Sequence, residues 1–199
     1  NANVAGAGKT KLCDVVALIA TGRPMPRTVW PSGGYANEEV RKRVTSIALA
    51  GERVILIDNA DEPIGGASLD AALTSVTWKD RVLGESSMTT ELPLHTIWFA
   101  SGNNLQCYGD LLRRVLFARV ESPLERPEER TGFKYPDRLG YVAENRPRLV
   151  AAGLTILRAY QEVGRPAVPV GLLGSFEGWS RSIAFPVAWI MGVDPMKVR

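Results

Sequence analysis

Residues 3–10 read Asn3-Val4-Ala5-Gly6-Ala7-Gly8-Lys9-Thr10, and this stretch decides the fold that the sequence predicts. In the pattern G-x-x-x-x-G-K-[ST], glycines let backbone N–H groups surround phosphates, the lysine reaches the outer phosphates and the hydroxyl binds Mg²⁺. Asn3 stands in place of the first glycine, and asparagine enters the left-handed backbone region more readily than most residues. We therefore expect residues 3–11, from Asn3 to Lys11, to bind phosphate, with Thr10 on the metal.

A helix is predicted directly after this loop. Lys11 to Thr21 carries apolar residues at helical spacing, Gly22 is typical of a helix C-terminus, and Pro24 follows. The N-terminus of this helix points at the loop, where its dipole favours a bound anion. The alternative is a glycine-rich turn before an ordinary helix.

A buried strand that ends in an acid is predicted at residues 53–58. The run from Arg53 to Asp58 is aliphatic and β-branched, which is typical of a parallel strand buried on both faces. Ligands of doubly wound folds lie at the carboxyl ends of strands, so we expect Asp58 to share the Mg²⁺ with Thr10. The alternative is an aspartate in an ordinary turn.

The residue after this acid bears on hydrolysis. Many P-loop ATPases have a glutamate there that polarises the attacking water, whereas this chain has Asn59, whose amide cannot take a proton. Asp61 is the first candidate to supply a carboxylate instead, and Glu62 is another. Asn59 could also position the water while solvent accepts the proton.

Further polar residues follow a second strand. Thr96 to Ala100 is predicted as a buried strand, and Asn103 or Asn104 behind it could hydrogen-bond a γ-phosphate or the attacking water. Such asparagines are also common in turns.

A short helix is predicted at residues 109–114, leading into a strand at 115–120. Its Arg113 and Arg114 either form surface ion pairs or present a guanidinium to the γ-phosphate of another subunit.

Other elements are expected between these motifs. Asn37 is predicted to cap a helix that ends at Gly51, and residues 66–74 form a second, short helix. Residues 76–94 then read as a hairpin that turns at 84–87, either a surface hairpin or a loop that grips nucleic acid.

With these motifs assembled, the chain resembles the AAA+ ATPases, and among them the ATPase module of phage, plasmid and mobile-element primase-helicases related to superfamily 3. The segments that carry the resemblance are 4–10 (VAGAGKT), 54–61 (VILIDNAD), 98–104 (WFASGNN) and 109–114 (GDLLRR), joined by 135–160 and 174–179.

This resemblance implies an ATP-hydrolysing motor that uses Mg²⁺ and acts on DNA as a ring, most often a hexamer. Lys9 and Thr10 would bind phosphate and metal, Asp58 would be the acid at the strand end, and Asn103 or Asn104 the polar sensor. Arg113 or Arg114 would act on the neighbouring subunit's ATP. Two other function classes are an assembly module that hydrolyses little ATP, suggested by Asn59, and a protein-remodelling ATPase.

The second half of the chain reads as helical. A charged linker at 125–130 precedes predicted helices at 136–145, 146–164 and 175–191, the last kinked at Pro186. AAA+ proteins commonly carry a helical lid here, in which Arg146, Arg148 and Arg181 are candidates for a nucleotide contact. The predicted fold is thus an α/β P-loop core at 1–124 with a parallel central sheet, and a helical lid at 125–199.

Composition narrows the remaining classes. There are 24 Lys and Arg against 21 Asp and Glu, which permits a nucleic-acid partner without requiring one. A single histidine, His95, excludes a His-based metal site, and two distant cysteines favour a reducing cytoplasm. No apolar run approaches a membrane span. Because a P-loop fold begins with a strand and none precedes residue 3, we expect the chain to be a piece of a longer polypeptide.

Overall fold

The computed structural model describes residues 6–33, 36–81 and 87–197. Within them, β1 (Arg27–Thr28), β2 (Val54–Ile57) and β5 (Ile97–Ala100) form a parallel sheet in the order β1-β2-β5. Ile57 pairs with Thr28 on one side and with Ala100 on the other, so all three strands end at the same edge. The predicted α/β class and the parallel pairing of the two aliphatic strands are confirmed.

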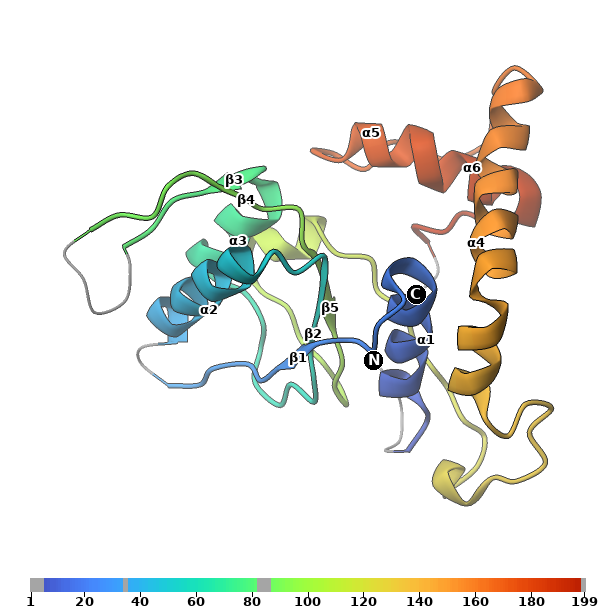
Figure 1. Ribbon diagram of the computed structural model, residues 1–199, viewed down its shortest axis with the longest axis horizontal. Coiled ribbons are helices and arrows are strands. Elements are labelled where there is room, and N and C mark those ends of the chain that lie inside the picture. The colour runs from blue at the N-terminus through green and yellow to red at the C-terminus, as the bar shows by residue number, and fades with distance from the viewer. Residues whose placement is uncertain (1–5, 34–35, 82–86, 198–199) are drawn as a thin grey trace.

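Helices cover both faces of this sheet (Figure 1). α1 (Lys9–Thr21) lies on one face, between the sheet and the long helix α4 (Arg138–Glu162), whereas α2 (Ala36–Ala50) and α3 (Ala67–Thr74) lie on the other. The helix predicted after the glycine-rich loop is confirmed, and it ends at Gly22, as expected, in the left-handed conformation. Gly6 and Gly8 therefore lie directly before a helix that packs on the sheet.

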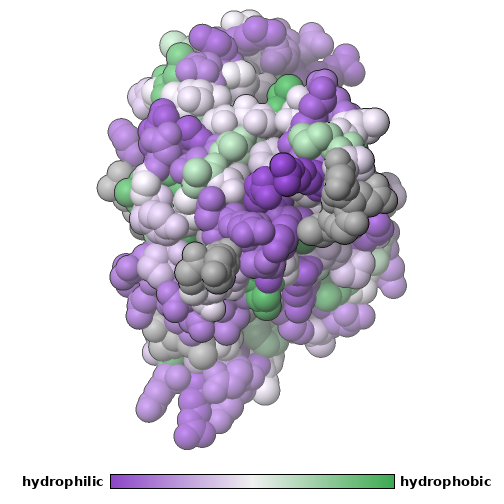
Figure 2. All heavy atoms as spheres, turned by 90° about the vertical axis from the view of Figure 1, so that its left-hand side faces the viewer, coloured by the Kyte–Doolittle hydropathy of each residue, from purple (hydrophilic) through white to green (hydrophobic). Residues whose placement is uncertain are grey.

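An antiparallel hairpin stands beside α2. β3 (Thr77–Trp78) pairs with β4 (Leu92–Pro93), and Arg81 bridges Met88, which confirms a hairpin within 76–94. Most of its predicted turn, at 84–87, lies outside the described residues. The face of the molecule that carries this hairpin is mainly hydrophilic, with hydrophobic side chains scattered over it (Figure 2).

A buried aspartate ties the hairpin to α2. Asp80 is only 7% exposed. Its Oδ2 accepts from Thr45 Oγ1 of α2 at 2.7 Å, its Oδ1 accepts from the Arg81 amide at 2.8 Å, and Arg41 forms an ion pair with it at 3.2 Å. Trp78 donates its indole N–H to the same Thr45 hydroxyl at 2.9 Å. A buried charge needs such pairing to offset its desolvation, so this network fixes the base of the hairpin.

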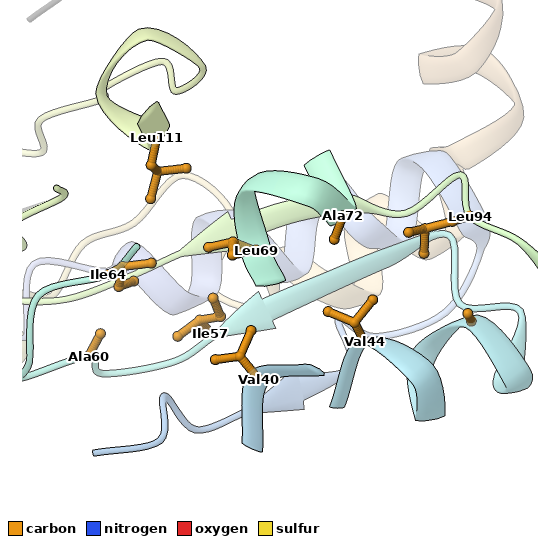
Figure 3. Close-up of a cluster of buried hydrophobic side chains, with 10 residues drawn as sticks. Val40, Val44, Ile57, Ala60, Ile64, Leu69, Ala72, Leu94 and Leu111 are labelled. Atoms are coloured by element: carbon orange, nitrogen blue, oxygen red, sulfur yellow. The ribbon is translucent and has the colours of Figure 1, made fainter. Parts of the chain in front are cut away.

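The main core lies between the sheet and helices α2 and α3 (Figure 3). All four residues of β2 are buried, as a central parallel strand requires. The helices contribute residues at spacings of three and four, which lie on one helix face. This core contains Val40 and Val44 of α2, Leu69 and Ala72 of α3, Ile57, Ala60, Ile64, Leu94 and Leu111. A second cluster fills the opposite face, where Ala17 of α1 meets Met25, Val54 and Leu56.

Two predictions for the sheet are wrong. β5 is not buried on both faces, because it is an edge strand among the described residues and Ile97 is 61% exposed. The strand predicted at 115–120 is also missing: residues 115–119 are neither strand nor helix, and Leu116 and Phe117 are exposed. Apolar alternation marks residues that could form a strand, but it supplies no partner strand to pair with.

The cap predicted at Asn37 acts on a different helix. Asn37 lies inside the first turn of α2, and its Oδ1 accepts from the Ser68 amide at 3.0 Å. The Ser68 hydroxyl donates in return to the Asn37 carbonyl at 3.0 Å. The prediction that Asn37 caps its own helix is therefore wrong, and the start of α3 is satisfied from α2.

One long helix replaces the two predicted at 136–164. α4 runs unbroken through Pro147, with Asp137 as its cap: the Asp137 carboxylate accepts from the Gly140 amide at 2.9 Å. Past it, α5 (Glu177–Trp179), a π-helical turn η3 (Ser180–Ala184) and α6 (Phe185–Met191) form one continuous helical run. The π turn ends at Ala184, two residues before Pro186, which lies in the first turn of α6. The kink predicted at Pro186 stays a prediction. The division into a core and a lid stays a prediction.

Candidate functional site

Four polar side chains that are distant in sequence meet where α1 begins. Lys9 Nζ donates to Asn103 Oδ1 at 2.8 Å, and Thr10 Oγ1 donates to Asp58 Oδ1 at 3.1 Å. α1 supplies the first residue of each pair, whereas Asp58 follows β2 and Asn103 lies in the loop after β5. Because β2 and β5 are parallel neighbours, their carboxyl ends deliver both partners to the same place.

Ser101 is a further member of this site that the sequence interpretation did not single out. It directly follows β5, as Asp58 directly follows β2, and its hydroxyl donates to Asp58 Oδ1 at 2.7 Å. The same hydroxyl accepts from the Asn59 amide at 3.2 Å. The register of the two strands could have identified Ser101, because residues that end paired strands lie side by side. Asp58 is therefore held by two hydroxyl donors.

The start of α1 provides further hydrogen-bond donors. Its first residue is preceded by Gly8, whose φ of 89° lies in the left-handed region where glycine is favoured. Among the described residues, no side chain caps this end. The first N–H groups of a helix have no partner within the helix, and the helix dipole places partial positive charge there. Together with the Lys9 ammonium, this end suits a polyphosphate.

The oxygen atoms beside this helix end suit Mg²⁺. Magnesium prefers carboxylate, hydroxyl and phosphate oxygens and usually takes one or two carboxylates plus substrate phosphates. Thr10 and Ser101 supply two hydroxyls, each within hydrogen-bond distance of the Asp58 carboxylate. Across the described ranges, no group of three His, Cys, Asp or Glu side chains is gathered for a metal. The donor set thus fits a cation shared with a phosphate ligand.

A second carboxylate lies behind Asp58. Asp14, one helical turn beyond Thr10 on α1, is 8% exposed, and its Oδ2 accepts from Arg27 Nη2 at 2.8 Å. Arg27 Nη1 lies 3.8 Å from Asp58 Oδ2, so one guanidinium stands between the two acids. Burial raises the pKa of the Cys13 thiol, and the negative charges of Asp58 and Asp14 raise it further. The i, i+4 spacing from Thr10 could have identified Asp14, whereas nothing in the local pattern marked Arg27.

Another carboxylate stands over the glycine-rich loop. Glu128 belongs to the short turn η2 (Pro127–Glu129), and its Oε2 lies 2.6 Å from the position that a Cβ on Gly6 would take. Any larger residue at position 6 would displace this side chain. Glu128 is exposed. Its negative charge opposes a polyphosphate arriving at the loop.

The two candidate arginines occupy different environments. Arg114 has a side chain only 10% exposed, donates to the Asp70 carbonyl at 2.6 Å and to Asp110 at 2.8 Å, and so ties η1 (Gly109–Arg113) to α3. Arg113 is 59% exposed and, within the described part of the chain, is hydrogen-bonded to Asp110 of the same turn alone, at 3.1 and 2.9 Å. This hydrogen bonding raises the pKa of Arg113 and lowers that of Asp110. Arg113 is thus the one placed to reach another molecule.

Arg146 binds the far end of α1. Its guanidinium donates to the carbonyls of Leu18, Ile19 and Ala20 at 3.1, 3.0 and 3.3 Å. These carbonyls lie at the C-terminus of the helix, whereas the phosphate-binding loop precedes its N-terminus. Arg146 is therefore a helix cap from α4 and not a nucleotide contact.

The side chains of the other predicted site residues take no part in the hydrogen bonds above. Asn3, Val4 and Ala5 fall outside the described residues, while Ala7 precedes Gly8 and Lys11 follows Thr10. Asn59 and Asn104 both adopt left-handed backbone conformations, with φ of 53° and 54°. Asp61 is exposed in the loop after β2, and among the described residues no hydrogen bond joins it to Lys9, Thr10 or Asp58.

The basic residues near the hairpin are mostly paired. Arg41 of α2 forms an ion pair with Asp80. Lys42, also of α2, forms ion pairs with Glu38 and Glu39. Lys79 lies 3.6 Å from Glu91 across the hairpin, with both side chains more than half exposed. An exposed pair of this kind opens at little cost.

Comparison with known proteins gave no match: no family model, no curated protein and no solved structure is similar to this chain. The site is therefore interpreted from its own residues. Within the described part of the chain, no helix combines the length and apolar character that crossing a bilayer demands.

Proposed function

We propose that the protein is a P-loop ATPase of the AAA+ type, which binds ATP with Mg²⁺ at the start of α1 and hydrolyses it. One observation carries this proposal: Lys9 and Thr10, adjacent at the N-terminus of a helix, are hydrogen-bonded to Asn103 and Asp58, which follow neighbouring parallel strands. A lysine, a hydroxyl, a strand-end acid and a strand-end amide in this arrangement are the parts that phosphoryl transfer to water needs.

Each residue has a role that follows from its chemistry. The Lys9 ammonium exchanges Asn103 for phosphate oxygens when ATP binds, because a charged acceptor is the stronger partner. Asn103, released from Lys9, then has its amide free to orient the attacking water or the γ-phosphate. Thr10 and Asp58 hold Mg²⁺, which neutralises charge on the phosphate oxygens when it is bound. Water attacks the γ-phosphorus, the bond from that phosphorus to the bridging oxygen breaks, the proton of the water passes to solvent, and ADP and inorganic phosphate leave.

Phosphate release from ATP, measured colorimetrically, tests this proposal. The wild-type protein and Lys9→Ala are compared with and without single-stranded DNA. Lys134→Ala, which removes an exposed lysine outside the phosphate-binding loop, is the control. We expect phosphate release that Lys9→Ala reduces about 100-fold or more and that Lys134→Ala changes by less than about threefold. Phosphate release that does not depend on Lys9 would refute the motor.

A second candidate function is ATP-driven assembly with little turnover. Asn59 favours it, because its amide cannot accept a proton. In the part of the chain that the structure describes, Asp61 also makes no hydrogen bond to Lys9, Thr10 or Asp58. Sedimentation with a non-hydrolysable ATP analogue separates the two functions. Nucleotide-dependent rings with negligible phosphate release favour assembly, whereas rings with Lys9-dependent release favour the motor.

We place the motor in a replication primase-helicase, as a ring of this chain that acts on DNA in the cytoplasm. Support comes from the hairpin, on which Lys79 and Arg81 are exposed and which Asp80 anchors at its base. The face that carries the hairpin is largely hydrophilic (Figure 2). Arg113 is the exposed arginine that would reach the ATP of a neighbouring subunit. If Lys79→Ala with Arg81→Ala leaves DNA affinity and DNA-stimulated turnover unchanged, the hairpin is not the contact; turnover indifferent to DNA points to protein remodelling.

A further inference from the structure

Two charged side chains beside the metal-binding residues have no part in the function proposed so far. Asp14 and Arg27 form an ion pair with N···O of 2.8 Å, in which the side chain of Asp14 is 11% exposed and that of Arg27 is 48% exposed. Asp14 Oδ1 is fully buried and has no hydrogen-bond partner among the residues that the structure describes. A buried oxygen in this state costs free energy, so Asp14 is not explained by packing alone.

Arg27 lies within ion-pair distance of two carboxylates, those of Asp14 and Asp58. Its guanidinium is in contact with Asp14 at 2.8 Å but stays 3.8 Å from Asp58 Oδ2. A guanidinium presents several N–H groups in a fixed fork and competes directly with a metal ion for a carboxylate. If Arg27 moved onto Asp58, it would neutralise the one acid that Thr10 and Ser101 hold in place.

We propose that Asp14 is a positioning residue that holds Arg27 away from Asp58 and so keeps the Asp58 carboxylate available to Mg²⁺. This inference rests on the proposed function. Asp14 does not itself bind the metal; its place is behind Arg27. The three charges of Asp14, Arg27 and Asp58 sum to −1. Without Asp14, the charges of Arg27 and Asp58 sum to zero, and the Arg27 guanidinium is drawn to the Asp58 carboxylate.

The charges give an ordered series of variants. Asp14→Asn keeps the shape but frees Arg27, so Mg²⁺ should bind about tenfold more weakly, as expected for moving a unit charge by about 1 Å at a partly buried site. Arg27→Met removes the competing cation and should strengthen Mg²⁺ binding. The double variant Asp14→Asn with Arg27→Met has the wild-type charge of −1 and no competitor, so it should regain wild-type Mg²⁺ binding.

A binding measurement separates these effects from loss of folding. The dissociation constant of a fluorescent ATP analogue is measured in Mg²⁺ and in EDTA. The ratio of the constant in EDTA to the constant in Mg²⁺ gives the contribution of the metal to binding. A purely structural role of Asp14 would weaken both affinities alike and leave the ratio unchanged. The double variant leaves no buried unpaired charge, so it remains informative if a single variant folds poorly.

We expect the ratio to fall about tenfold in Asp14→Asn and to return in the double variant. An unchanged ratio in Asp14→Asn, or a double variant that stays as weak as Asp14→Asn, overturns the inference while leaving the ATPase proposal standing. The second of these results would make Asp14 a metal ligand. If the wild-type protein fails to bind the analogue both in Mg²⁺ and in EDTA, this inference and the ATPase proposal are both overturned.

Discussion

Replacing Arg146 by methionine should loosen the attachment of α4 to α1 without touching the candidate site. The Arg146 guanidinium donates three hydrogen bonds to the last carbonyls of α1, those of Leu18, Ile19 and Ala20. It also lies 3.5 Å from the position of a Cβ on Gly22. Methionine keeps an apolar stem of similar length but removes both the charge and the donors.

The structure sets the size of the effect. A cation at a partly buried helix C-terminus contributes up to about 2 kcal/mol, and hydrogen bonds from a charged group contribute about 1.5–3 kcal/mol. Leu18 keeps a second partner, the Gly22 amide at 2.9 Å. We therefore expect a loss of about 2 kcal/mol in the free energy of unfolding. For a chain of this length that lowers Tm by about 4–8 °C.

Thermal and urea unfolding, followed by circular dichroism, measure this loss. Arg148→Met is the matched control, because Arg148 is exposed two residues further along the same helix. Arg146→Lys should fall between the wild type and Arg146→Met, since it retains the charge without the fork. Equal losses for Arg146→Met and Arg148→Met would refute the capping role.

Three other substitutions test contacts elsewhere. Asp80→Ala should lower the free energy of unfolding in urea by about 3 kcal/mol or more, because it removes a buried carboxylate with several partners. Glu91→Gln, at an exposed ion pair, should lower it by less than about 0.5 kcal/mol, and similar losses for the two variants would contradict the anchoring of the hairpin. Arg114→Ala should lower Tm by several degrees, because it breaks the tie between η1 and α3, while Arg113→Ala leaves Tm unchanged and lowers phosphate release; the reverse pattern would exchange their roles. Glu128→Gln should tighten ATP binding about two- to fivefold by removing an exposed like charge, and an unchanged dissociation constant at low salt would show that this side chain is clear of the phosphates.

The sequence predicted an element correctly where the residues of that element alone carry its pattern. α1 has a helical apolar period and a glycine at its end, and β2 is a continuous aliphatic run, so both were predictable. The order of motifs also predicted that Asp58 and Asn103 would come to the start of α1, because parallel strands end at one edge. The placement of Asp58 and Asn103 could therefore be predicted from the parallel sheet alone.

The predictions failed where a partner is far along the chain. Asn37 caps α3, which starts 30 residues later, and nothing near Asn37 marks that partner. Pro147 predicted a helix start, but α4 continues through it. The cost of an interior proline, about 3 kcal/mol, is offset by packing on either side of it, where Arg146 binds α1 and Tyr160 contacts Trp189 of α6.

The site shows the same division. Lys9, Thr10 and Asp58 belong to short motifs that could be recognised in the sequence. Arg27 and Asp14 come from a strand and a helix whose side chains meet only in the folded chain, and their types are common on any surface. The choice between Arg113 and Arg114 likewise depended on burial, which the sequence of two adjacent arginines does not reveal.

The structure of the protein with Mg²⁺ and a non-hydrolysable ATP analogue tests the central claim most directly. We predict the analogue's phosphates at the N-terminus of α1, with Lys9 Nζ transferred from Asn103 to a phosphate oxygen and the metal beside Thr10 and Asp58. An analogue bound elsewhere, or a Lys9 that keeps Asn103 with nucleotide present at saturating concentration, would contradict the account.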